Sequence, residues 1–307
     1  MNYKKLIKNR ELRLKLLNAL SWVPDKAMVK IQYRIKTGRK LNLKNPERYT
    51  EKLQKYKLYY RDDKMPICVD KYSVRDYIGK KRFGKLLNSL YAMYDNNSEI
   101  DFSGFPDKFV IKDTIGAGSN SVLVIDKKKK DYDEDKIKKI ISEWIKIKPS
   151  KSVSREWPYD YLKHRVVVEK YLEQKNGDLD DYKFFCFDGK VRYFYKRSGY
   201  AKNHDDGKMS FYDREKKWLK GVGLDYCKAS LSKQDLCKNI DEMIEIADEL
   251  SKDFPHVRVD LYNIDGKIVF GELTFYNAGG YMIFTPDKFD FEMGEGFKLE
   301  DGNGKKN

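Results

Sequence analysis

The chain has 307 residues, and its 40% hydrophobic and 14% aromatic content is enough for a large core, which argues against a disordered protein. The formal net charge is +15, so anionic partners are favoured. No run approaches the roughly 18 apolar residues of a membrane-spanning helix, and the basic start lacks the apolar stretch of a secretory signal, so we expect a cytoplasmic protein.

The positive charge is concentrated at the N-terminal end. Residues 1–60 hold 17 Lys and Arg against 4 Asp and Glu, a net charge of +13, and the rest of the chain carries +2. Leucines at three- and four-residue spacings among basic residues predict a helix over 3–20. We expect this segment to contact an acidic glycan or the anionic inner face of a membrane, with Leu16 and Trp22 buried there. The alternative is that Leu16 and Trp22 pack onto the body while the charges face water.

Helices and one hairpin follow in the first half of the chain. Residues 48–60 read as a helix, and a second helix over 71–78 is expected to begin after Asp70. The segment PDKFVIKDTIGAGSNSVLVID (106–126) reads as strand, glycine turn and strand. A short helix is predicted over 136–147.

The second half of the chain opens on an apolar strand, VVVEKYL (166–172). Two hairpins are then predicted, one turning at Asp188-Gly189 and one over 256–276 turning at Asp265-Gly266. An amphipathic helix over 233–252 lies between them. Antiparallel hairpins mixed with helices predict an α+β fold, since a doubly wound sheet needs regular β-α-β alternation.

The cysteines do not form a metal motif. Cys68, Cys186, Cys227 and Cys237 contain no CxxC pair, and the three histidines are scattered. We therefore predict buried free thiols in a reducing compartment.

The glycine turn over 116–120, GAGSN, is the first feature with potential chemistry. It joins two strand-like runs and follows Lys112. Backbone N–H groups of such a turn can contact phosphate oxygens, and a lysine adds a point charge there. The turn matches neither a P-loop nor a Rossmann fingerprint. An ordinary flexible hairpin also explains it.

Two carboxylates, Asp260 and Glu272, fall on the two arms of one hairpin, in strands that are otherwise apolar. An unpaired carboxylate is costly to bury there, and two side by side repel unless a cation lies between them. Oxygen ligands together with nucleotide phosphates suit Mg²⁺. The alternative is that both side chains face solvent. Arg258 shares a strand face with Asp260, as a salt-bridge partner or as an anion binder.

Further polar residues interrupt the other strands. Glu169 and Lys170 stand where an apolar strand meets a loop, and Asp181 and Lys183 follow on the next strand at a spacing of two. Their order carries more weight than any single residue: a basic strand, a glycine hairpin, an acid at a strand end, then D-x-K, R-x-D and E-x-T.

That order resembles the ATP-grasp superfamily, whose members clamp ATP between two α+β subdomains. FVIKDTIGAGSNSV resembles the lysine strand with its glycine loop, VEKYL the hinge that meets adenine, and VRVDLY and FGELTFYNAGG the two metal-binding strands. Where many members have E-x-N, this chain has Glu272-Leu-Thr274, and Thr274 or Asn277 would compensate. Three further segments are similar to the TupA-like ATP-grasp family, namely KLNLKNPERYTEKLQKYKLYYRDD, VDKYSVRDYIGKK and REWPYDYLKHRVVVEKYL. The resemblance covers roughly residues 30–290.

The resemblance implies an ATP-grasp fold with a basic helical N-terminal segment. The expected parts are the basic segment (1–60), the N-terminal part of the catalytic body (61–105), a subdomain with the lysine strand and glycine loop (106–172), and a subdomain with the metal-binding strands (173–307).

The resemblance also implies ATP and Mg²⁺ as cofactors and assigns residues to them. Nucleotide binding falls to Lys112, Gly116, Gly118, Ser119, Glu169, Lys170, Leu172 and Asp181. Metal binding falls to Asp260 and Glu272, and catalysis to Arg258 and Lys183.

The family is associated with teichuronopeptide and other bacterial surface-polysaccharide biosynthesis. The resemblance therefore implies an ATP-dependent carboxylate–amine ligase that acts through an acyl phosphate on an acidic glycan or an amino acid, with peripheral membrane contact through residues 1–60. The alternatives are an ATP-grasp phosphotransferase and a sugar-nucleotide glycosyltransferase. A nucleic-acid-binding protein fits the charge, but no recognised binding module is present, so no specific nucleic acid is expected.

Overall fold

The computed structural model describes residues 17–116, 118–199 and 207–299. The chain divides into two compact units, each treated by itself below: unit 1 comprises 1–62, 151–157 and 175–307, and unit 2 comprises 63–150 and 158–174. The four-part division expected from the sequence stays a prediction. Most of the helix predicted over 3–20 lies outside the described residues. In the described ranges, no helix has the length and apolar character needed to cross a membrane.

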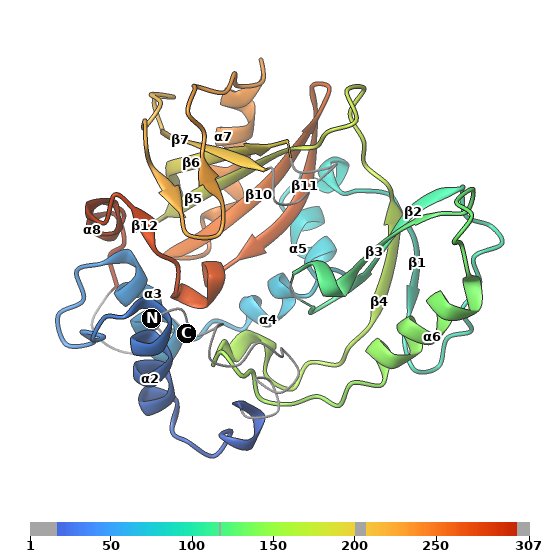
Figure 1. Ribbon diagram of the computed structural model, residues 1–307, viewed down its shortest axis with the longest axis horizontal. Helices are drawn as coiled ribbons and strands as arrows, with labels where there is room; N and C mark the ends of the chain where they lie inside the picture. The colour runs from blue at the N-terminus through green and yellow to red at the C-terminus, as the bar shows by residue number, and fades with distance from the viewer. Residues whose placement is uncertain (1–16, 117, 200–206, 300–307) are drawn as a thin grey trace. The chain divides into compact units, whose positions relative to one another are not determined.

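Unit 2 is built on a four-stranded antiparallel sheet with the strand order β1-β4-β2-β3 (Figure 1). Its core is formed by alternate strand residues such as Phe109 and Ile111, packed with Ile137 and Ile141 of helix α6. The strands are β1 (Leu90–Tyr94), β2 (Lys108–Asp113), β3 (Val122–Asp126) and β4 (Val166–Lys170). The helices are α4 (Lys64–Val69), α5 (Val74–Lys80) and α6 (Glu134–Ile145), with 3₁₀ turns η2 (Gly84–Leu86) and η3 (Ser119–Ser121).

Two predictions for unit 2 are settled by these bounds. The hairpin expected over 106–126 is confirmed by the antiparallel pairing of β2 with β3. The helix expected over 71–78 begins later, at Val74. Asp70 Oδ1 accepts the backbone N–H groups of Tyr72 and Ser73 at 3.0 and 2.7 Å, so the residues after Asp70 form a turn that precedes the helix.

Unit 1 contains a six-stranded sheet with the order β11-β10-β5-β6-β7-β9. All its pairs are antiparallel except the short parallel pair of β7 with β9. The strands are β5 (Asp180–Phe187), β6 (Lys190–Ser198), β7 (Lys208–Asp213), β9 (Lys228–Ala229), β10 (His256–Ile264) and β11 (Lys267–Thr274). A two-stranded sheet pairs β8 (Gly223–Leu224) with β12 (Phe284–Thr285). Both predicted hairpins are confirmed, and with them the α+β fold.

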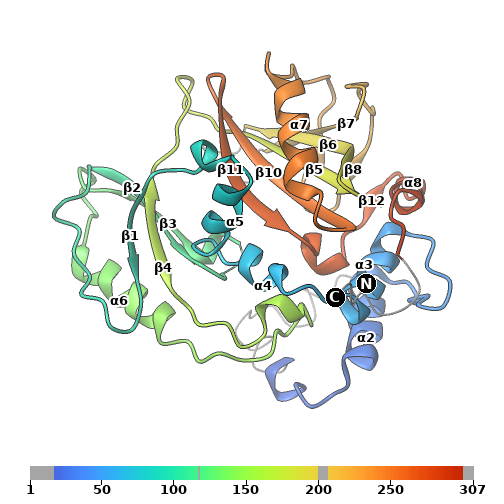
Figure 2. The ribbon, with the colours of Figure 1, turned by 180° about the vertical axis from the view of Figure 1, so that it is seen from behind.

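Alternation along the central strands gives this sheet two different faces. One face carries buried apolar residues such as Phe184, Val257 and Val259, and helix α7 (Ile240–Ser251) contacts β5, β6 and β10 there (Figure 2). The other face carries Phe185 and then, farther along the strands, a cluster of charged residues. The sheet therefore positions polar side chains on a rigid, well-packed base.

The N-terminal helices α2 (Asp25–Thr37) and α3 (Tyr49–Tyr59) belong to unit 1 with the C-terminal half of the chain. Helix α3 packs against α8 (Lys288–Glu295), and the ring of Tyr49 lies 6.0 Å from that of Phe185. A Cβ at Gly294 would come within 2.0 Å of the carbonyl oxygen of Glu47, so only glycine allows this approach. Part of the basic segment is thus a packed layer of unit 1.

Candidate active site

In unit 2, Glu169 is the centre of a small ion cluster. Lys112 on β2 and Glu169 on β4 share one sheet face, and Lys112 Nζ donates to Glu169 Oε2 at 2.7 Å. Arg75 of α5 donates to Glu169 Oε1 at 3.3 Å. Glu169 is 8% exposed, so one buried carboxylate is held by two cations, and the cluster keeps a net positive charge. Such a surplus suits a phosphate group.

The glycine turn of unit 2 is fixed at Gly116. A Cβ at this position would lie 2.3 Å from the Cβ of Ser121 and 2.8 Å from Oδ2 of Asp113, so glycine is required by the close approach of the chain. Lys71 Nζ donates to the carbonyl oxygen of Gly116 at 2.7 Å. Gly118 has a φ of 77°, in the left-handed region. Ser119 follows in η3, and residue 117 lies outside the described ranges.

The remaining predicted residues of unit 2 lie where β4 ends. Lys170 is exposed, and its backbone is already engaged: its N–H donates to Ser89 O at 2.9 Å, and its carbonyl accepts from Asn88 Nδ2 at 2.8 Å. Leu172 is partly buried just beyond the strand. The structure therefore brings Glu169 together with Lys112 and leaves Lys170 and Leu172 outside that cluster.

In unit 1, the hairpin of β10 and β11 places Asp260 directly opposite Glu272. The pairing shifts between Asp260 and Leu261, because Gly271 is an extra residue on β11. A Cβ at Gly271 would lie 3.0 Å from the carbonyl oxygen of Asp260, so the bulge favours glycine. The bulge brings Glu272, and not Gly271, into register with Asp260.

Arg258 supplies the cation between these two carboxylates. Its Nε and Nη2 donate to the two oxygens of Asp260 at 2.6 and 2.7 Å, and Nη2 also donates to Glu272 Oε1 at 3.0 Å. Asp260 is 2% exposed, so the alternative that both carboxylates face solvent is wrong for Asp260, whereas the Glu272 side chain is 46% exposed. Of the two roles weighed for Arg258, the salt-bridge partner is the one the contacts show.

Thr274 and Asn277, the two residues considered in place of the missing asparagine, both reach this cluster. Thr274 Oγ1 accepts from Arg258 Nη2 at 3.0 Å and donates to Glu272 Oε1 at 2.9 Å. The Oδ1 of Asn277 accepts from Arg258 Nη1. Both residues therefore hold the guanidinium group in place.

Strand β5 adds Lys183 and Asp181 to the same face. Lys183 is the register partner of Asp260, and its Nζ lies 2.5 Å from Asp260 Oδ2 and 2.8 Å from Asp181 Oδ2. Asp181 is 5% exposed, and its Oδ1 makes no hydrogen bond within the described part of the chain. Three carboxylates thus face two cations, which leaves the cluster with a formal charge of −1.

Burial and charge act in opposite directions on these groups. Desolvation raises the pKa of Asp260 to about 6, while the charges of Arg258 and Lys183 lower it. Burial lowers the pKa of Lys183, but the charges of Asp181 and Asp260 outweigh it, so this pKa lies above its usual value. The pKa of Arg258 is also raised, with the Asp260 charge overcoming desolvation. The cations therefore stay protonated at neutral pH.

The donor set of this cluster fits Mg²⁺ that also binds phosphate. Asp260 and Glu272 face each other, and Asp181 Oδ1 is a buried oxygen without a hydrogen bond in the described ranges. Considering described residues alone, no group of three or more His, Cys, Asp or Glu side chains is arranged to hold a metal. Mg²⁺ commonly takes one or two carboxylates and completes its shell with phosphate oxygens and water. The residues fit that mode and not an all-protein cage.

Four residues around the two clusters were missed by sequence reasoning. Lys57 Nζ and Gln54 Nε2 of α3 donate to the carbonyl oxygens of Gly279 and Gly280 at 2.6 and 2.8 Å, in the 3₁₀ turn η6 (Asn277–Gly280) that carries Asn277. In unit 2, Arg75 and Lys71 hold Glu169 and the glycine turn. The glycines of NAGG signal a turn, but no local pattern points to partners so distant in the sequence.

Comparison with known proteins gives one family and several distant structures. A family model described as TupA-like ATPgrasp matches residues 51–298. No curated protein matches the chain. A D-alanine–D-alanine ligase from Bacillus anthracis is similar at 18% identity with a TM-score of 0.41, covering 68% of this chain and 57% of its own. The corresponding ligase from Helicobacter pylori has 15% identity and a TM-score of 0.44, covering 81% and 68%.

An L-amino acid ligase from Bacillus licheniformis is similar at 12% identity and a TM-score of 0.37, covering 69% of this chain and 42% of its own length. The chain therefore spans less than two thirds of the Bacillus structures that it matches here.

Proposed function

The chain belongs to the TupA-like ATP-grasp family, and we propose on this basis that it is an ATP-dependent carboxylate–amine ligase. We place its role in bacterial surface-polysaccharide or teichuronopeptide-like biosynthesis, with an acidic glycan or an amino acid among its substrates. The observation that carries the proposal is the cluster of Arg258, Asp260, Glu272 and Lys183 on one sheet face. It combines oxygen ligands for a metal with cations for a phosphorylated intermediate.

Residues of unit 2 are assigned to the nucleotide. Lys112 contacts phosphate oxygens, and its present partner Glu169 is also held by Arg75, which keeps that carboxylate neutralised when Lys112 moves to phosphate. Backbone N–H groups of the turn over 116–120 cover the terminal phosphates. Glu169 and the backbone that follows Lys170, over 171–172, meet adenine or ribose.

Residues of unit 1 are assigned to the metal and the reacting groups. Asp260 and Glu272 hold Mg²⁺, which neutralises the charge on the phosphate oxygens when bound. Asp181 contacts ribose, and Lys183 contacts phosphate. Among the described residues Arg258 Nη1 makes one hydrogen bond, to Asn277, and we assign its second N–H to the substrate.

The chemistry follows from the weakness of a carboxylate as an electrophile. A carboxylate oxygen of the substrate attacks the γ-phosphorus of ATP, the bond to the bridging oxygen breaks, and ADP leaves with the electron pair. The amine nitrogen then attacks the acyl carbon, the carbon–oxygen bond to phosphate breaks, and the amine loses a proton. Arg258 stabilises the oxyanion of the tetrahedral intermediate.

Labelling of the substrate carboxylate tests this sequence of bonds. With ¹⁸O in the carboxylate, a ligase transfers one labelled oxygen to inorganic phosphate and forms an amide only when both the carboxylate and the amine are present. A phosphotransferase instead leaves a stable phosphorylated product without an amide. Consumption of a sugar nucleotide with no release of ADP would identify a glycosyltransferase. Either of these two results contradicts the proposal.

A second part of the proposal concerns contact with an anionic membrane through residues 1–60. Leu16, with the basic residues before it, lies outside the described ranges, but Leu20 and Trp22 are 41% and 77% exposed. Packing of Trp22 onto the body is therefore not observed. Exposed aromatic and aliphatic residues near basic ones are typical of interfacial segments.

Vesicle sedimentation tests this part of the proposal. Anionic vesicles should pellet the protein at low salt, with less binding at high salt because surface charge is screened. Trp22→Ser should weaken the binding. Failure to bind at either salt concentration would contradict the membrane contact and leave the ligase proposal untouched.

A further inference from the structure

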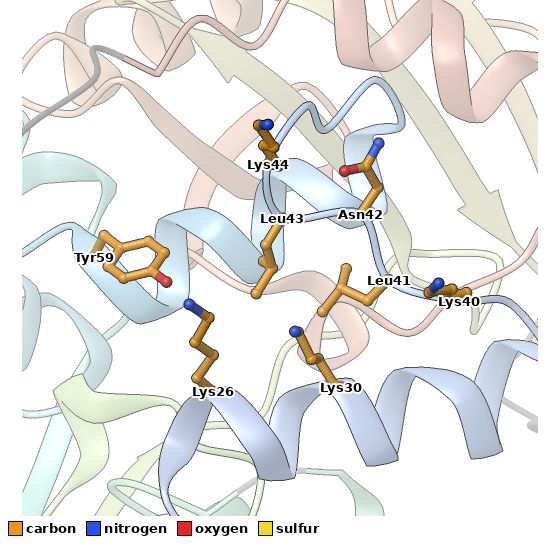
Figure 3. Close-up of a pocket in the computed structure, with 8 residues that line it drawn as sticks. All are labelled: Lys26, Lys30, Lys40, Leu41, Asn42, Leu43, Lys44 and Tyr59. Atoms are coloured by element: carbon orange, nitrogen blue, oxygen red, sulfur yellow. The ribbon is translucent and has the colours of Figure 1, made fainter.

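A second concave site lies in the N-terminal part of unit 1. It is a cavity of about 660 Å³ between α2, the segment 40–44 and the end of α3 (Figure 3). Its lining consists of Lys26, Lys30, Lys40, Leu41, Asn42, Leu43, Lys44 and Tyr59. Four of these eight residues are lysines, and none is acidic. No residue of the proposed ligase site belongs to it.

Local structure brings the lysines together from two directions. Lys26 and Lys30 are four residues apart on α2, so they project from the same side of the helix (Figure 3). The helix ends at Thr37, and the φ of 75° at the following Gly38 lets the chain reverse. The returning segment places Lys40 and Lys44 on either side of two leucines.

The returning segment is fixed by buried contacts. Leu41 is 6% exposed, and the N–H of Asn42 donates at 3.1 Å to Oε1 of the buried Glu51. Asn42 Oδ1 accepts the backbone N–H of Asn45 at 3.0 Å, which closes a turn. The cavity is therefore a built feature of the fold, because its wall is anchored to α3.

The positive charge of this cavity is not compensated by the protein. Counting described residues alone, the exposed side chains of Lys26, Lys30, Lys40 and Lys44 make no hydrogen bond or ion pair. A second cavity of about 640 Å³ differs, because it is lined by both signs of charge and its Lys190 and Arg214 both pair with Asp248. Like charges gathered in a hollow focus the potential and attract anions.

The kind of anion is indicated by the residue types. Arginine recognises carboxylate and phosphate alike through two parallel hydrogen bonds, whereas lysine acts as a point charge, the form in which it commonly binds phosphate. All four cations in this cavity are lysines. The volume is within the range of about 300 to 1,000 Å³ that holds small organic ligands.

The apolar part of the lining indicates an organic group beside the phosphates. Leu41 and Leu43 point into the space, and the half-exposed ring of Tyr59 closes one side (Figure 3). A membrane surface would not enter a concave site of this kind. We propose that this cavity binds an organic diphosphate or triphosphate, with the phosphates on the lysines and the organic group against Tyr59 and the leucines.

Site-resolved labelling of lysines tests the proposal on the full-length protein. The labelling rate of each lysine with an amine-reactive reagent is measured by mass spectrometry, with tripolyphosphate, UDP, citrate or anionic vesicles at equal ionic strength. Tripolyphosphate and UDP should slow labelling of the pocket lysines by about fivefold or more, because their amino groups are then held by phosphate. Lys129 and Lys130, exposed on a loop of unit 2, should react unchanged.

Several outcomes would overturn the proposal. Two concern the labelling rate: equal slowing at Lys129 and Lys130, or no slowing at any lysine. Two concern the ligand: protection by citrate as strong as that by tripolyphosphate, or protection by vesicles alone. The last of these would mark the surface as a membrane contact. The Lys112→Met variant should show the same pocket protection as the wild type, so the outcome is separable from the ligase proposal.

Paired variants give an independent measurement. Lys30→Ala with Lys40→Ala should weaken tripolyphosphate binding at the pocket by about tenfold or more, because two of its four charges are lost. Lys129→Ala with Lys130→Ala removes the same charge from a loop of unit 2 and should leave tripolyphosphate binding at the pocket unchanged. Equal affinity in both double variants would overturn the proposal. Lys30→Arg keeps the charge and should retain most of the binding.

Discussion

Glu272 is the most accessible acidic group of the cluster in unit 1, and it gives the cleanest test of the metal site. Its side chain is 46% exposed, whereas Asp260 is 2% exposed. Glu272→Gln keeps the side-chain volume and removes one negative charge opposite the triphosphate. We expect turnover to fall by about 100-fold or more with little change in the thermal midpoint. The exposed Glu245 on α7 supplies the control, since Glu245→Gln should have normal turnover.

Asp260→Asn should behave differently from Glu272→Gln. Asp260 accepts hydrogen bonds from Arg258 and Lys183. The substitution therefore leaves these two cations without their main partner. We expect loss of turnover together with a loss of stability, on the order of 3 to 5 kcal/mol, measured by denaturant unfolding. Unchanged stability and unchanged turnover in this variant would count against the assigned cluster.

His256 makes stability depend on pH. Its Nδ1 donates to the carbonyl oxygen of Cys186 at 2.8 Å, and its Nε2 accepts from the hydroxyl of Tyr49 at 2.9 Å. Burial lowers the pKa of this fully buried imidazole to about 3, below the unfolded value of about 6.5. Below pH 6.5, His256 therefore binds a proton in the unfolded chain but stays neutral in the native state. Stability from this group is complete above pH 6.5 and is lost as pH falls toward 3.

The expected slope is up to about 1.4 kcal/mol per pH unit from this one group. Urea unfolding at several pH values between 5 and 7 measures it. His256→Gln removes the titrating group, so its free energy of unfolding should depend less on pH than that of the wild type. Identical slopes in the two proteins would exclude His256 as the cause.

At the scale of elements, α3 offers a matched pair of tyrosines. Tyr49 is fully buried, and Tyr59, on the same helix, is 50% exposed. Tyr49→Ala should cost about 3 to 5 kcal/mol because it leaves a cavity among aromatic rings, measured by denaturant unfolding. Tyr59→Ala should change stability by no more than about 0.5 kcal/mol. Similar effects of the two substitutions would contradict the packing of α3 on the sheet of unit 1.

The glycine turn of unit 2 can be tested in the same way. Gly116→Ala places a Cβ against Ser121, whereas a Cβ at Gly104 meets nothing within 4 Å. Gly116→Ala should therefore distort the turn and weaken ATP binding, and Gly104→Ala should leave it unchanged. Titration calorimetry checks both. Equal ATP affinity in the two variants would remove the turn from the nucleotide site.

The predictable elements are those fixed by local chemistry. Asp188-Gly189 and Asp265-Gly266 turn their hairpins with positive φ at every position, from 48° to 95°, as the residue types require. The sequence placed Asp260 and Glu272 on the two arms of one hairpin. Their direct opposition depends on a bulge, because an unbroken hairpin would pair Asp260 with Gly271. The bulge at Gly271 was not foreseen, because a bulge depends on how both strands pack.

Contacts between distant segments could not be predicted. Arg75 reaches Glu169, and Lys57 reaches Gly279, across more than 90 residues of sequence in each case. Arg75 and Lys57 lie in segments that resemble the family, but no chemical pattern in those segments indicates their partners. Their positions follow from how helices pack on strands, which alternation and turn signals do not specify. The prediction of buried free thiols, in contrast, is confirmed for Cys68, Cys186 and Cys227, whereas Cys237 is only partly buried.

At the scale of the whole molecule, the N-terminal residues and the C-terminal half form one unit. Within the described part of this segment, residues 17–60 hold 11 Lys and Arg against 3 Asp and Glu, so a charge surplus lies on a packed layer of unit 1. Because an ATP ligand bound only by the native state stabilises it by mass action, ATP with Mg²⁺ should raise the thermal midpoint. At 100 times the Kd, the stabilisation is about 2.7 kcal/mol. A midpoint that responds to UDP-sugars and not to ATP would favour glycosyl transfer.

The most direct measurement is calorimetric titration of ATP into the full-length protein with and without Mg²⁺. We predict binding by the wild type that is tighter with Mg²⁺, loss of this metal effect in Glu272→Gln, and weak binding in Lys112→Met under both conditions. The physical reason is that Glu272 acts through the metal, whereas Lys112 contacts the phosphates directly. No binding of ATP by the wild type, or binding that Mg²⁺ and both substitutions leave unchanged, would contradict the account.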